Sequence, residues 1–180
     1  STIGTRNRGK KNDPRNRLVY QVLRFALAFK PKTIMMENVP ALVNDIKLTR
    51  LIAELKKAGY KIDVKVLNMS NYNVPQARRR MIMLASRLGE IEVVEQKLST
   101  DKIVTVRKAI SFLPPVGQSG DKLHDIVEKH KPNTKKIISL IPKNGGSRTD
   151  LPDKYILECH KRTTGFRDVY GRMQWDKPSP

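Results

Sequence analysis

The chain has 180 residues, 38% of them hydrophobic, which is enough for one ordinary domain or for one domain with a small appendage. Its formal net charge of +19, from 36 lysines and arginines against 17 acidic residues, indicates a polyanionic partner, with nucleic acid ahead of a membrane surface. A single cysteine excludes an internal disulfide framework and a cysteine-based zinc site, and it favours a reducing cytosol. No apolar run approaches the ~18 to 20 residues of a membrane span.

The first 17 residues carry a dense positive charge. Arg6, Arg8, Lys10 and Lys11 lie among small and polar residues with little acidic compensation. Such a segment is typical of a loop that binds phosphates. A solvated terminal tail would have the same composition, so charge alone does not decide between the two.

Hydrophobic periodicity then predicts alternating helices and strands. Asp13 and Pro14 give a helix-start signal, and Gly59 is typical of a helix end. The predicted elements are a helix over 18–29, a strand over 33–36, a helix around 48–55, a strand over 62–66 with one solvated face, and a strand over 81–85. The last two strands are expected to be antiparallel, and the whole is expected to be part of an α/β sheet.

A carboxylate at the end of the first predicted strand needs an explanation. In "PKTIMMENVPALV", Glu37 and Asn38 directly follow an apolar run. Glutamate is a poor strand residue and is costly to bury without a partner. Because ligands bind at the carboxyl ends of strands in open α/β sheets, Glu37 is a candidate site residue. The methionines of this strand and of the 81–85 strand are interpreted as core filling.

An arginine run precedes the last predicted strand in "PQARRRMIMLAS". If this stretch is extended, Gln76, Arg78 and Arg80 point to one side and Arg79 to the other. Three polar side chains would then line up at the entrance to the sheet. An ordinary solvated strand edge that discourages aggregation is the alternative reading.

Beyond about Gly117 the periodicity weakens, and proline, glycine and basic residues accumulate. In "IPKNGGSRTDLP", Gly146 allows close backbone approach, and Ser147 and Arg148 can donate to phosphates or bases. An ordinary surface turn remains an alternative.

The later stretch "CHKRTTGFRDVYGRMQW" combines several donors with an aromatic ring. Arg162, Arg172 and Tyr170 are its candidate DNA-binding residues. Arginine can read guanine edges in the major groove, although the sequence does not assign any residue to a base.

Several of these stretches together resemble one family. "DPRNRLVYQVLRF", "PKTIMMENVPAL" and "VLNMSNYNVPQARRRMIMLASR", in this order, are similar to the middle of a DNA cytosine-5 methyltransferase, with its Glu-Asn-Val and Gln-x-Arg-x-Arg motifs. "TVRKAISFLPP", "IPKNGGSRTDLP" and "GFRDVYGRMQWDKPSP" resemble the region in and around the target recognition part of bacterial restriction-modification members. The resemblance covers essentially the whole chain.

The resemblance implies an α/β fold and assigns different functions to successive segments of the chain. We expect part of a Rossmann-like S-adenosylmethionine-dependent methyltransferase sheet, followed by a small irregular target recognition domain. Residues 1–116 would be the second half of the catalytic domain, 117–166 the recognition region, and 167–180 a segment returning to the catalytic domain.

The resemblance also implies roles for individual residues in methyl transfer from S-adenosyl-L-methionine to C5 of a flipped cytosine. Glu37 would contact N3 and the exocyclic amine, and Arg80 would contact O2. Arg78 would position Glu37 or a DNA phosphate, Gln76 would lie in the DNA cleft, and Asn38 would hold the loop that carries the nucleophile.

Some family features have no counterpart in this sequence. The Pro-Cys nucleophile pair would precede Ser1, and no Gly-rich cofactor turn is found, so we expect a fragment that is inactive alone, without a cofactor or metal site. Cys159 lacks the preceding proline and falls in the recognition part, so it is no substitute. An exposed hydrophobic sheet edge and an exposed apolar face of the 18–29 helix are expected to favour self-association.

The expected partner is duplex DNA, with no membrane and with a cognate restriction endonuclease as a functional partner. The expected location is the bacterial cytoplasm, in association with the nucleoid. Two alternatives remain: a catalytically inactive DNA-binding module, which would have no use for Glu37 and Arg80, and an RNA cytosine-5 methyltransferase of the same fold, which would keep both.

Overall fold

The computed structural model describes residues 17–162 and 170–180, and these divide into two compact units. The first unit contains residues 17–72 and 78–98. The second contains 73–77, 99–162 and 170–180. Each unit packs around its own buried residues and is described by itself.

The elements of the first unit are, in chain order, α1 (Val19–Phe29), β1 (Thr33–Asn38), the short helix η3 (Pro40–Asn44), α2 (Ile46–Lys57), β2 (Lys61–Asn68), η4 (Met69–Tyr72) and β3 (Arg79–Ser86). Those of the second unit are η5 (Thr100–Lys102), α3 (Val106–Ile110), α4 (Pro132–Leu140), η6 (Arg148–Asp150), η7 (Asp153–Tyr155) and α5 (Glu158–Lys161). The predicted helices and strands up to residue 86 are thus confirmed, and α1 begins at Val19 with Leu18 at its N-cap. The predicted helix-start signal at Asp13 and Pro14 lies outside the described residues.

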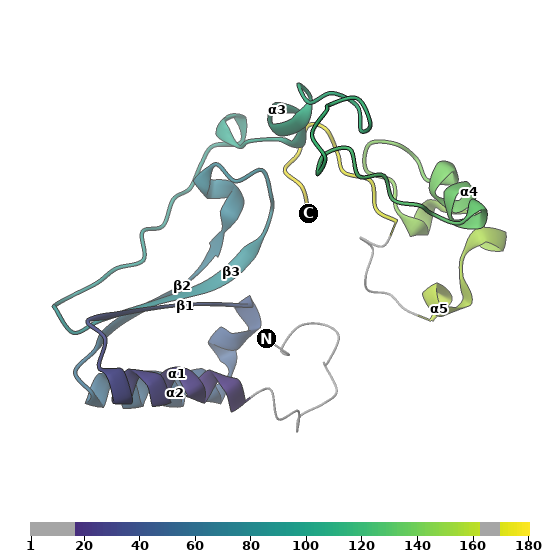
Figure 1. The fold of residues 1–180 in the computed structure, drawn as a ribbon. Helices are drawn as coiled ribbons and strands as arrows, with labels where there is room; N and C mark the ends of the chain where they lie inside the picture. Colours follow the sequence, from purple (N-terminus) through teal and green to yellow (C-terminus); the bar gives the residue numbers. More distant parts are fainter. Residues whose placement is uncertain (1–16, 163–169) are drawn as a thin grey trace. The chain divides into compact units, whose positions relative to one another are not determined.

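The strands of the first unit form one sheet in the order β1-β3-β2 (Figure 1). Because β3 is antiparallel to both neighbours, β1 and β2 run in the same direction, and α2 is the crossover between them. The antiparallel pairing of β2 with β3 is as predicted. The insertion of β3 between β1 and β2 was not predicted.

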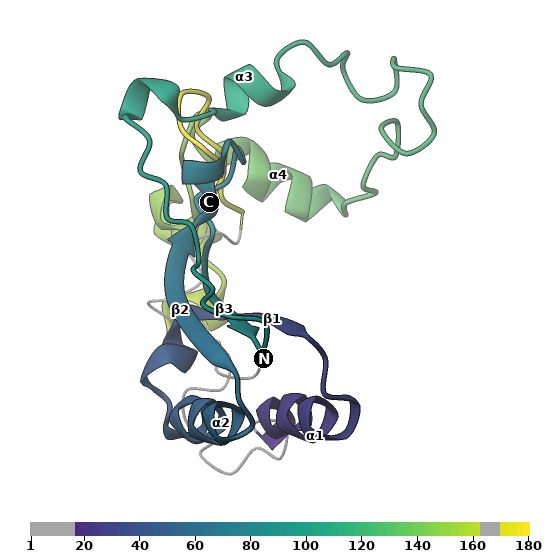
Figure 2. The same ribbon diagram turned by 90° about the vertical axis from the view of Figure 1, so that its left-hand side faces the viewer.

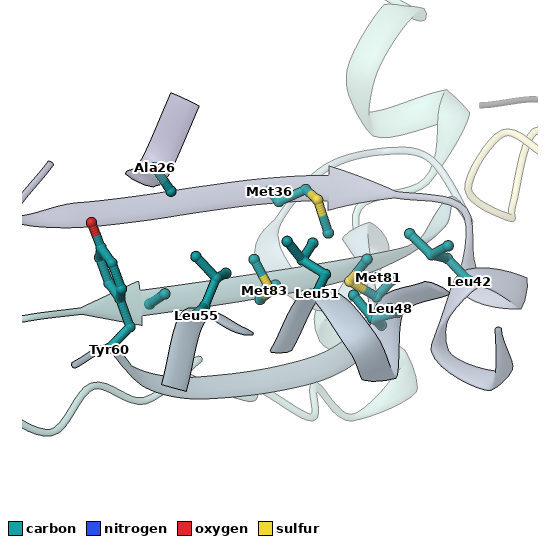
Figure 3. Close-up of a cluster of buried hydrophobic side chains, with 10 residues drawn as sticks. Ala26, Met36, Leu42, Leu48, Leu51, Leu55, Tyr60, Met81 and Met83 are labelled. Atoms are coloured by element: carbon teal, nitrogen blue, oxygen red, sulfur yellow. The ribbon is translucent and has the colours of Figure 1, made fainter. Parts of the chain in front are cut away.

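Both long helices of the first unit cover the same face of the sheet (Figures 1 and 2). Leu48, Leu51 and Leu55 recur at helical spacing on α2 and are completely or almost completely buried against Met81 and Met83 of β3 (Figure 3). The flexible methionines fill the space between the leucines and the strands, as predicted.

Met35 is an exception to the predicted core filling. This residue is 69% exposed, whereas its neighbour Met36 is buried. Strand side chains alternate between faces, so Met36 faces the helices and Met35 faces the other way. The interpretation of Met35 as a core residue is therefore wrong.

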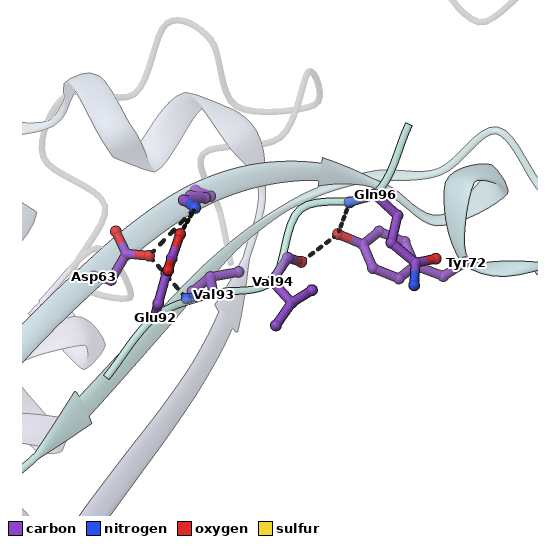
Figure 4. Close-up of polar contacts among 7 residues, drawn as sticks. Asp63, Tyr72, Glu92, Val93, Val94 and Gln96 are labelled. Atoms are coloured by element: carbon purple, nitrogen blue, oxygen red, sulfur yellow. Dashed lines mark hydrogen bonds and ion pairs between the residues drawn. The ribbon is translucent and has the colours of Figure 1, made fainter. Parts of the chain in front are cut away.

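The segment that follows β3 runs along β2 on the second face of the sheet, so the predicted solvated face of β2 is only partly exposed (Figure 4). The Asp63 carboxylate accepts a hydrogen bond from the Val93 N–H at 2.8 Å, and Lys65 donates to Glu92 at 2.9 Å. The Tyr72 hydroxyl also holds the segment that follows β3, because it donates a 2.6 Å hydrogen bond to the Val94 carbonyl. The polar residues of β2 hold a neighbouring segment while they remain partly exposed to water.

The outer side of α1 exposes large apolar side chains. Phe25 and Phe29 stack with ring centroids 6.0 Å apart, yet they are 50% and 76% exposed. Leu18 is also largely exposed. The predicted exposed apolar surface is thus present, and self-association through it stays a prediction.

The second unit is more regular than the sequence suggested, because it contains the helix α4. This helix was not predicted. Pro132 occupies the first turn of this helix, where its missing N–H costs no hydrogen bond. Ile137, within α4, and Ile141, which directly follows it, pack with Leu151 in a small buried core. These two isoleucines are the buried positions that mark the core-facing side of the helix. Two positions are too few to reveal a helical period in a sequence rich in basic residues.

Asp125 organises the loop of residues 117–125 in the second unit. Its carboxylate accepts hydrogen bonds from the Ser119 hydroxyl at 2.7 Å, from the Gly117 N–H at 2.8 Å and from the Gly120 N–H at 2.9 Å. The serine hydroxyl first, and then these backbone donors, lower the pKa of Asp125 from 3.8 to about 2.

This arrangement predicts a pH dependence of the loop. Because the folded-state pKa is depressed, the stabilisation is fully present above the ordinary value of 3.8 and is lost as pH falls through about 2. An NMR titration of the Asp125 carboxyl carbon is expected to give a midpoint near 2. A midpoint at the ordinary aspartate value would contradict the hydrogen-bonded loop.

Candidate active site

The strand order brings the predicted catalytic residues to one edge of the sheet. Since β1 and β2 run opposite to β3, the ends of β1 and β2 meet the beginning of β3. Glu37 stands one residue before the end of β1, opposite Ile82, and Arg80 is the second residue of β3, opposite Leu67. Glu37 and Arg80 are therefore diagonal neighbours on the same face.

These two side chains form an ion pair. Arg80 Nε lies 2.6 Å from Glu37 Oε1. The Arg80 side chain is 20% exposed, and that of Glu37 is 49% exposed. Arg80 also donates through Nη1 to its neighbour's carbonyl, that of Arg79, at 2.8 Å. The guanidinium is thus held in place while the carboxylate remains accessible to a ligand.

An apolar cluster lies on the same face of the sheet as the ion pair. Leu67, Ile82 and Val93 are buried there, and both residues that face Glu37 and Arg80 across the strands belong to this cluster. Apolar neighbours limit the water around a charged pair and so strengthen its electrostatic interactions with a ligand. The Glu37–Arg80 pair and this apolar floor form the candidate active site.

Asn38 and Arg78 flank the pair without joining it. The Asn38 side-chain oxygen accepts a hydrogen bond from the Val39 N–H at 2.8 Å, which orders the chain where it leaves β1. Arg78 is exposed and precedes β3, so the contact with Glu37 is made by Arg80. The proposed roles of Asn38 at the nucleophile loop and of Arg78 at a DNA phosphate stay predictions.

Gln76 belongs to the second unit. It forms an isolated parallel bridge with Ser179, and its Nε2 donates to the Pro180 carbonyl at 3.1 Å. These contacts attach the 73–77 segment to the end of the described chain. The expected alignment of Gln76 with the arginines spans both units and stays a prediction.

The glycine-containing turn of the second unit is tightly packed. A Cβ on Gly146 would lie 2.3 Å from the Pro142 carbonyl oxygen, so only glycine fits there. Ser147 caps the following short helix together with Asp150. Arg148 is only 4% exposed, and its guanidinium donates to the His160 carbonyl at 3.0 Å. The structure thus gives these predicted DNA-binding residues structural contacts, and their DNA contacts stay predictions.

The other predicted recognition residues differ in exposure. Arg172 donates through Nη2 to the Ile138 carbonyl at 2.8 Å, and its backbone N–H donates to the Gly146 carbonyl at the same distance. Tyr170 packs against the small core of the second unit, and Arg162 is exposed. Arg6, Arg8, Lys10 and Lys11 lie outside the described residues.

Two further features of the described residues bear on the kind of site. Within residues 17–162 and 170–180, no group of His, Cys, Asp and Glu side chains could hold a metal ion. Among the same residues, no helix is long and apolar enough to cross a membrane. Cys159 is exposed on α5.

Comparison with known proteins assigns the chain to a family. The model of the C-5 cytosine-specific DNA methylase family matches residues 1–165. The chain therefore belongs to the C-5 cytosine-specific DNA methylase family.

Similar proteins are Type II methyltransferases. M1.BsuMI of Bacillus subtilis is 32% identical over 179 residues, which cover 97% of this chain and 41% of that protein. The methylase M.HgiDII of Herpetosiphon aurantiacus is 30% identical over 172 residues, which cover 91% of this chain and 48% of that protein. The chain thus spans less than half the length of these relatives.

A solved structure supports the fold. A DNA modification methyltransferase encoded within prophage Cp of E. coli aligns with a TM-score of 0.51 and 22% identity, over 72% of this chain and 41% of that chain. At this level of identity the likeness concerns the mixed α/β fold alone.

Proposed function

We propose that this chain is part of a DNA cytosine-5 methyltransferase of a bacterial restriction-modification system. The complete protein would transfer a methyl group from S-adenosyl-L-methionine to C5 of a cytosine flipped out of duplex DNA. The observation that carries the proposal is the Glu37–Arg80 ion pair at the edge where β1 and β2 end, in a chain that belongs to this family. The net charge of +19 supports a polyanionic substrate.

The chemistry of cytosine explains why a carboxyl group and a guanidinium belong together. C5 is a poor nucleophile until a thiolate adds to C6, and negative charge then develops toward N3 and O2. Glu37 would hold the proton at N3 and accept from the exocyclic amine, while Arg80 would donate to O2. The thiolate would come from a cysteine in a part of the protein outside this chain.

The ion pair prepares Arg80 for this role. Its Nε is fixed by Glu37 at 2.6 Å, and its Nη1 is fixed by the Arg79 carbonyl at 2.8 Å. A donor that is already oriented requires no rearrangement when charge develops on the substrate, and this preorganisation is the main source of electrostatic catalysis. Arg80 is the one of the three consecutive arginines whose side chain pairs with Glu37, which favours it over Arg78 and Arg79 for this role.

S-adenosyl-L-methionine supplies an electrophilic methyl group on a cationic sulfur, and two cavities of the first unit do not fit it. One cavity, of about 410 Å³, is lined by Lys56, Tyr60 and Lys61, and its carboxylate, Glu90, is ion-paired with Lys61. A second, of about 400 Å³, is lined by Lys30, Lys57 and Arg87. These cations would repel the sulfonium group. We therefore assign no step with the cofactor to residues of this chain.

The finer fold and domain assignments also belong to this proposal. The β1-α2-β2 crossover, with both strands running in one direction, supports a Rossmann-like sheet that this chain contains in part. Residues 117–166 would read the DNA sequence, and 167–180 would return to the catalytic domain. The boundary between the two compact units falls between Leu98 and Ser99, whereas the proposed functional boundary lies at residue 117. The two boundaries differ because the first rests on contacts within the chain and the second on function.

Two experiments separate this proposal from its alternatives. The complete protein is expected to transfer a tritiated methyl group to duplex DNA and not to an RNA of the same sequence. Transfer to RNA alone would favour the RNA methyltransferase alternative. Absence of transfer with intact DNA binding would favour an inactive DNA-binding module.

The 180-residue chain itself is expected to bind duplex DNA in a strongly salt-dependent way. If its cations neutralise six to ten phosphates, affinity should fall roughly 10³ to 10⁵-fold between 50 and 200 mM salt, because bound counterions are released. Fluorescence anisotropy with a labelled duplex measures this. Salt-independent binding would contradict a phosphate interface.

A further inference from the structure

The second unit contains a cavity that the catalytic proposal does not use. Its volume is about 310 Å³. Its lining residues come from three separate stretches of the second unit: Val106, Ile110, Lys143, Asn144, Arg172, Met173 and Trp175.

Hydrogen bonds to the backbone fix the walls of this cavity. The Asn144 side-chain oxygen accepts from the Trp175 N–H at 2.8 Å, and the Trp175 carbonyl accepts from the Arg107 N–H at 2.8 Å. The Val106 N–H donates to the Lys177 carbonyl at 2.9 Å. The segment around Trp175 is thus held from both sides, so the cavity is formed before any ligand arrives.

The indole of Trp175 is an aromatic surface that is held in place by a neighbouring arginine. The Arg107 guanidinium lies 5.5 Å from the ring centroid and is itself held by the Asp176 carboxylate, with contacts of 2.8 and 3.3 Å. Even so, the residue Trp175 is 40% exposed, and the nearby Met173 is 48% exposed. An exposed but immobilised indole beside a thioether is suited to stacking with a flat aromatic ligand.

The charge of the lining selects for an anion. Lys143 and Arg172 are its charged members, and none of the lining residues is acidic. Asp176, next to Trp175 in sequence, is already paired with Arg107. Within the part of the chain that the structure describes, Lys143 forms no ion pair, so its ammonium group is available to a ligand. A cation beside an aromatic platform is the combination that nucleic-acid-binding grooves use for phosphate and base.

We propose that this cavity binds one unstacked nucleotide of the DNA substrate, with the base against Trp175 and Met173 and the adjoining phosphate at Lys143. This inference rests on the proposed function, since it takes DNA as the partner. It assigns Arg172 to the wall of the nucleotide site, where its guanidinium is braced by the Ile138 carbonyl. The cavity is a second DNA contact, separate from the Glu37–Arg80 pair.

The sequence offers a direct test, because Trp175 is the single tryptophan of the chain. Its fluorescence would be measured with a duplex that carries one unpaired nucleotide and with the same duplex made abasic at that position. The unpaired base is expected to quench the emission, and the abasic duplex is expected to quench it much less. A plot of log affinity against log salt concentration has a negative slope. Lys143→Gln should make this slope less steep by about one, because one phosphate contact is lost.

Lys122→Gln is the matched control, because Lys122 is an exposed lysine of the same unit outside the cavity lining. It should leave the difference in quenching between the two duplexes unchanged. Equal quenching by the two duplexes, with DNA binding confirmed by anisotropy, would overturn the nucleotide site and leave the proposed function intact. Equally strong quenching by free deoxynucleoside monophosphate would overturn the assignment to a DNA nucleotide. Absence of any DNA binding would instead contradict the proposed function.

Discussion

Replacing Glu37 with glutamine is expected to lower methyl transfer by the complete protein about 10² to 10⁴-fold, the range found for loss of one catalytic acid or base. Glutamine keeps the shape of the side chain but cannot hold and release a proton at N3. Because Glu37 is half exposed, loss of its ion pair with Arg80 should cost only about 0 to 1 kcal/mol of folding stability. Single-turnover methyl transfer and thermal unfolding, measured on the same preparation, separate the two effects.

Glu54→Gln provides the control for this substitution. Glu54 is also an ion-paired glutamate of the first unit, with its Oε1 2.7 Å from Lys57 Nζ. It lies on α2, which packs against the face of the sheet opposite to the Glu37–Arg80 pair. Turnover of this variant should match that of the unaltered protein. Equal turnover of the Glu37→Gln protein would remove Glu37 from the mechanism.

Replacing Arg80 with alanine is expected to lower turnover by roughly 10²-fold or more, because a preorganised donor to the substrate oxygen is lost. Arg80→Lys should recover only part of this loss, since a lysine retains the charge but not the fork of N–H donors that contacts Glu37 and the Arg79 carbonyl together. The ratio of kcat to KM for the three proteins, with circular dichroism as a folding check, measures the effect.

Arg79→Ala is the matched control for Arg80. Arg79 precedes it in β3, is exposed, and points to the opposite face of the sheet. Turnover of this variant should stay close to that of the unaltered protein. If Arg79→Ala and Arg80→Ala were equally impaired, a general loss of basic charge, and not a directed contact, would explain the effect.

The local elements of the first unit could be predicted because their side chains follow simple periods. Leu48, Leu51 and Leu55 mark the buried side of α2, and Gly59 ends the turn that follows it with a positive φ of 87°. Glu37 could be singled out because a carboxylate at the end of an apolar strand is costly without a partner. These signals depend on residues close together in the chain.

The pairings between distant segments could not be predicted, because no local pattern specifies them. The insertion of β3 between β1 and β2 decides that Arg80 lies diagonal to Glu37, and strand order is a property of the whole sheet. The attachment of Glu92 and Val93 to β2 likewise depends on contacts about 30 residues apart in sequence. Lys65 and Asp63 look like solvated strand residues until that segment is in place.

The basic residues of the second unit show a different limit of sequence reasoning. An arginine in a glycine-rich turn fits a DNA contact, yet Arg148 is buried and donates to the His160 carbonyl. Arginine has five N–H donors, and protein carbonyls can satisfy them as well as phosphates can. Trp175 shows the converse case, in which a residue with a possible ligand contact was not predicted. A lone tryptophan gives no sequence signal, and only the structure places Arg107 and Lys143 beside it.

Nucleoside analysis of the methylated product tests the central proposal most directly. Duplex DNA would be incubated with the complete protein and S-adenosyl-L-methionine, digested to nucleosides and examined by mass spectrometry. The account predicts 5-methyl-deoxycytidine, formed by the unaltered protein and strongly reduced in the Glu37→Gln protein. Methylation at an exocyclic amine of cytosine or adenine, or an undiminished yield of 5-methyl-deoxycytidine from the Glu37→Gln protein, would contradict it.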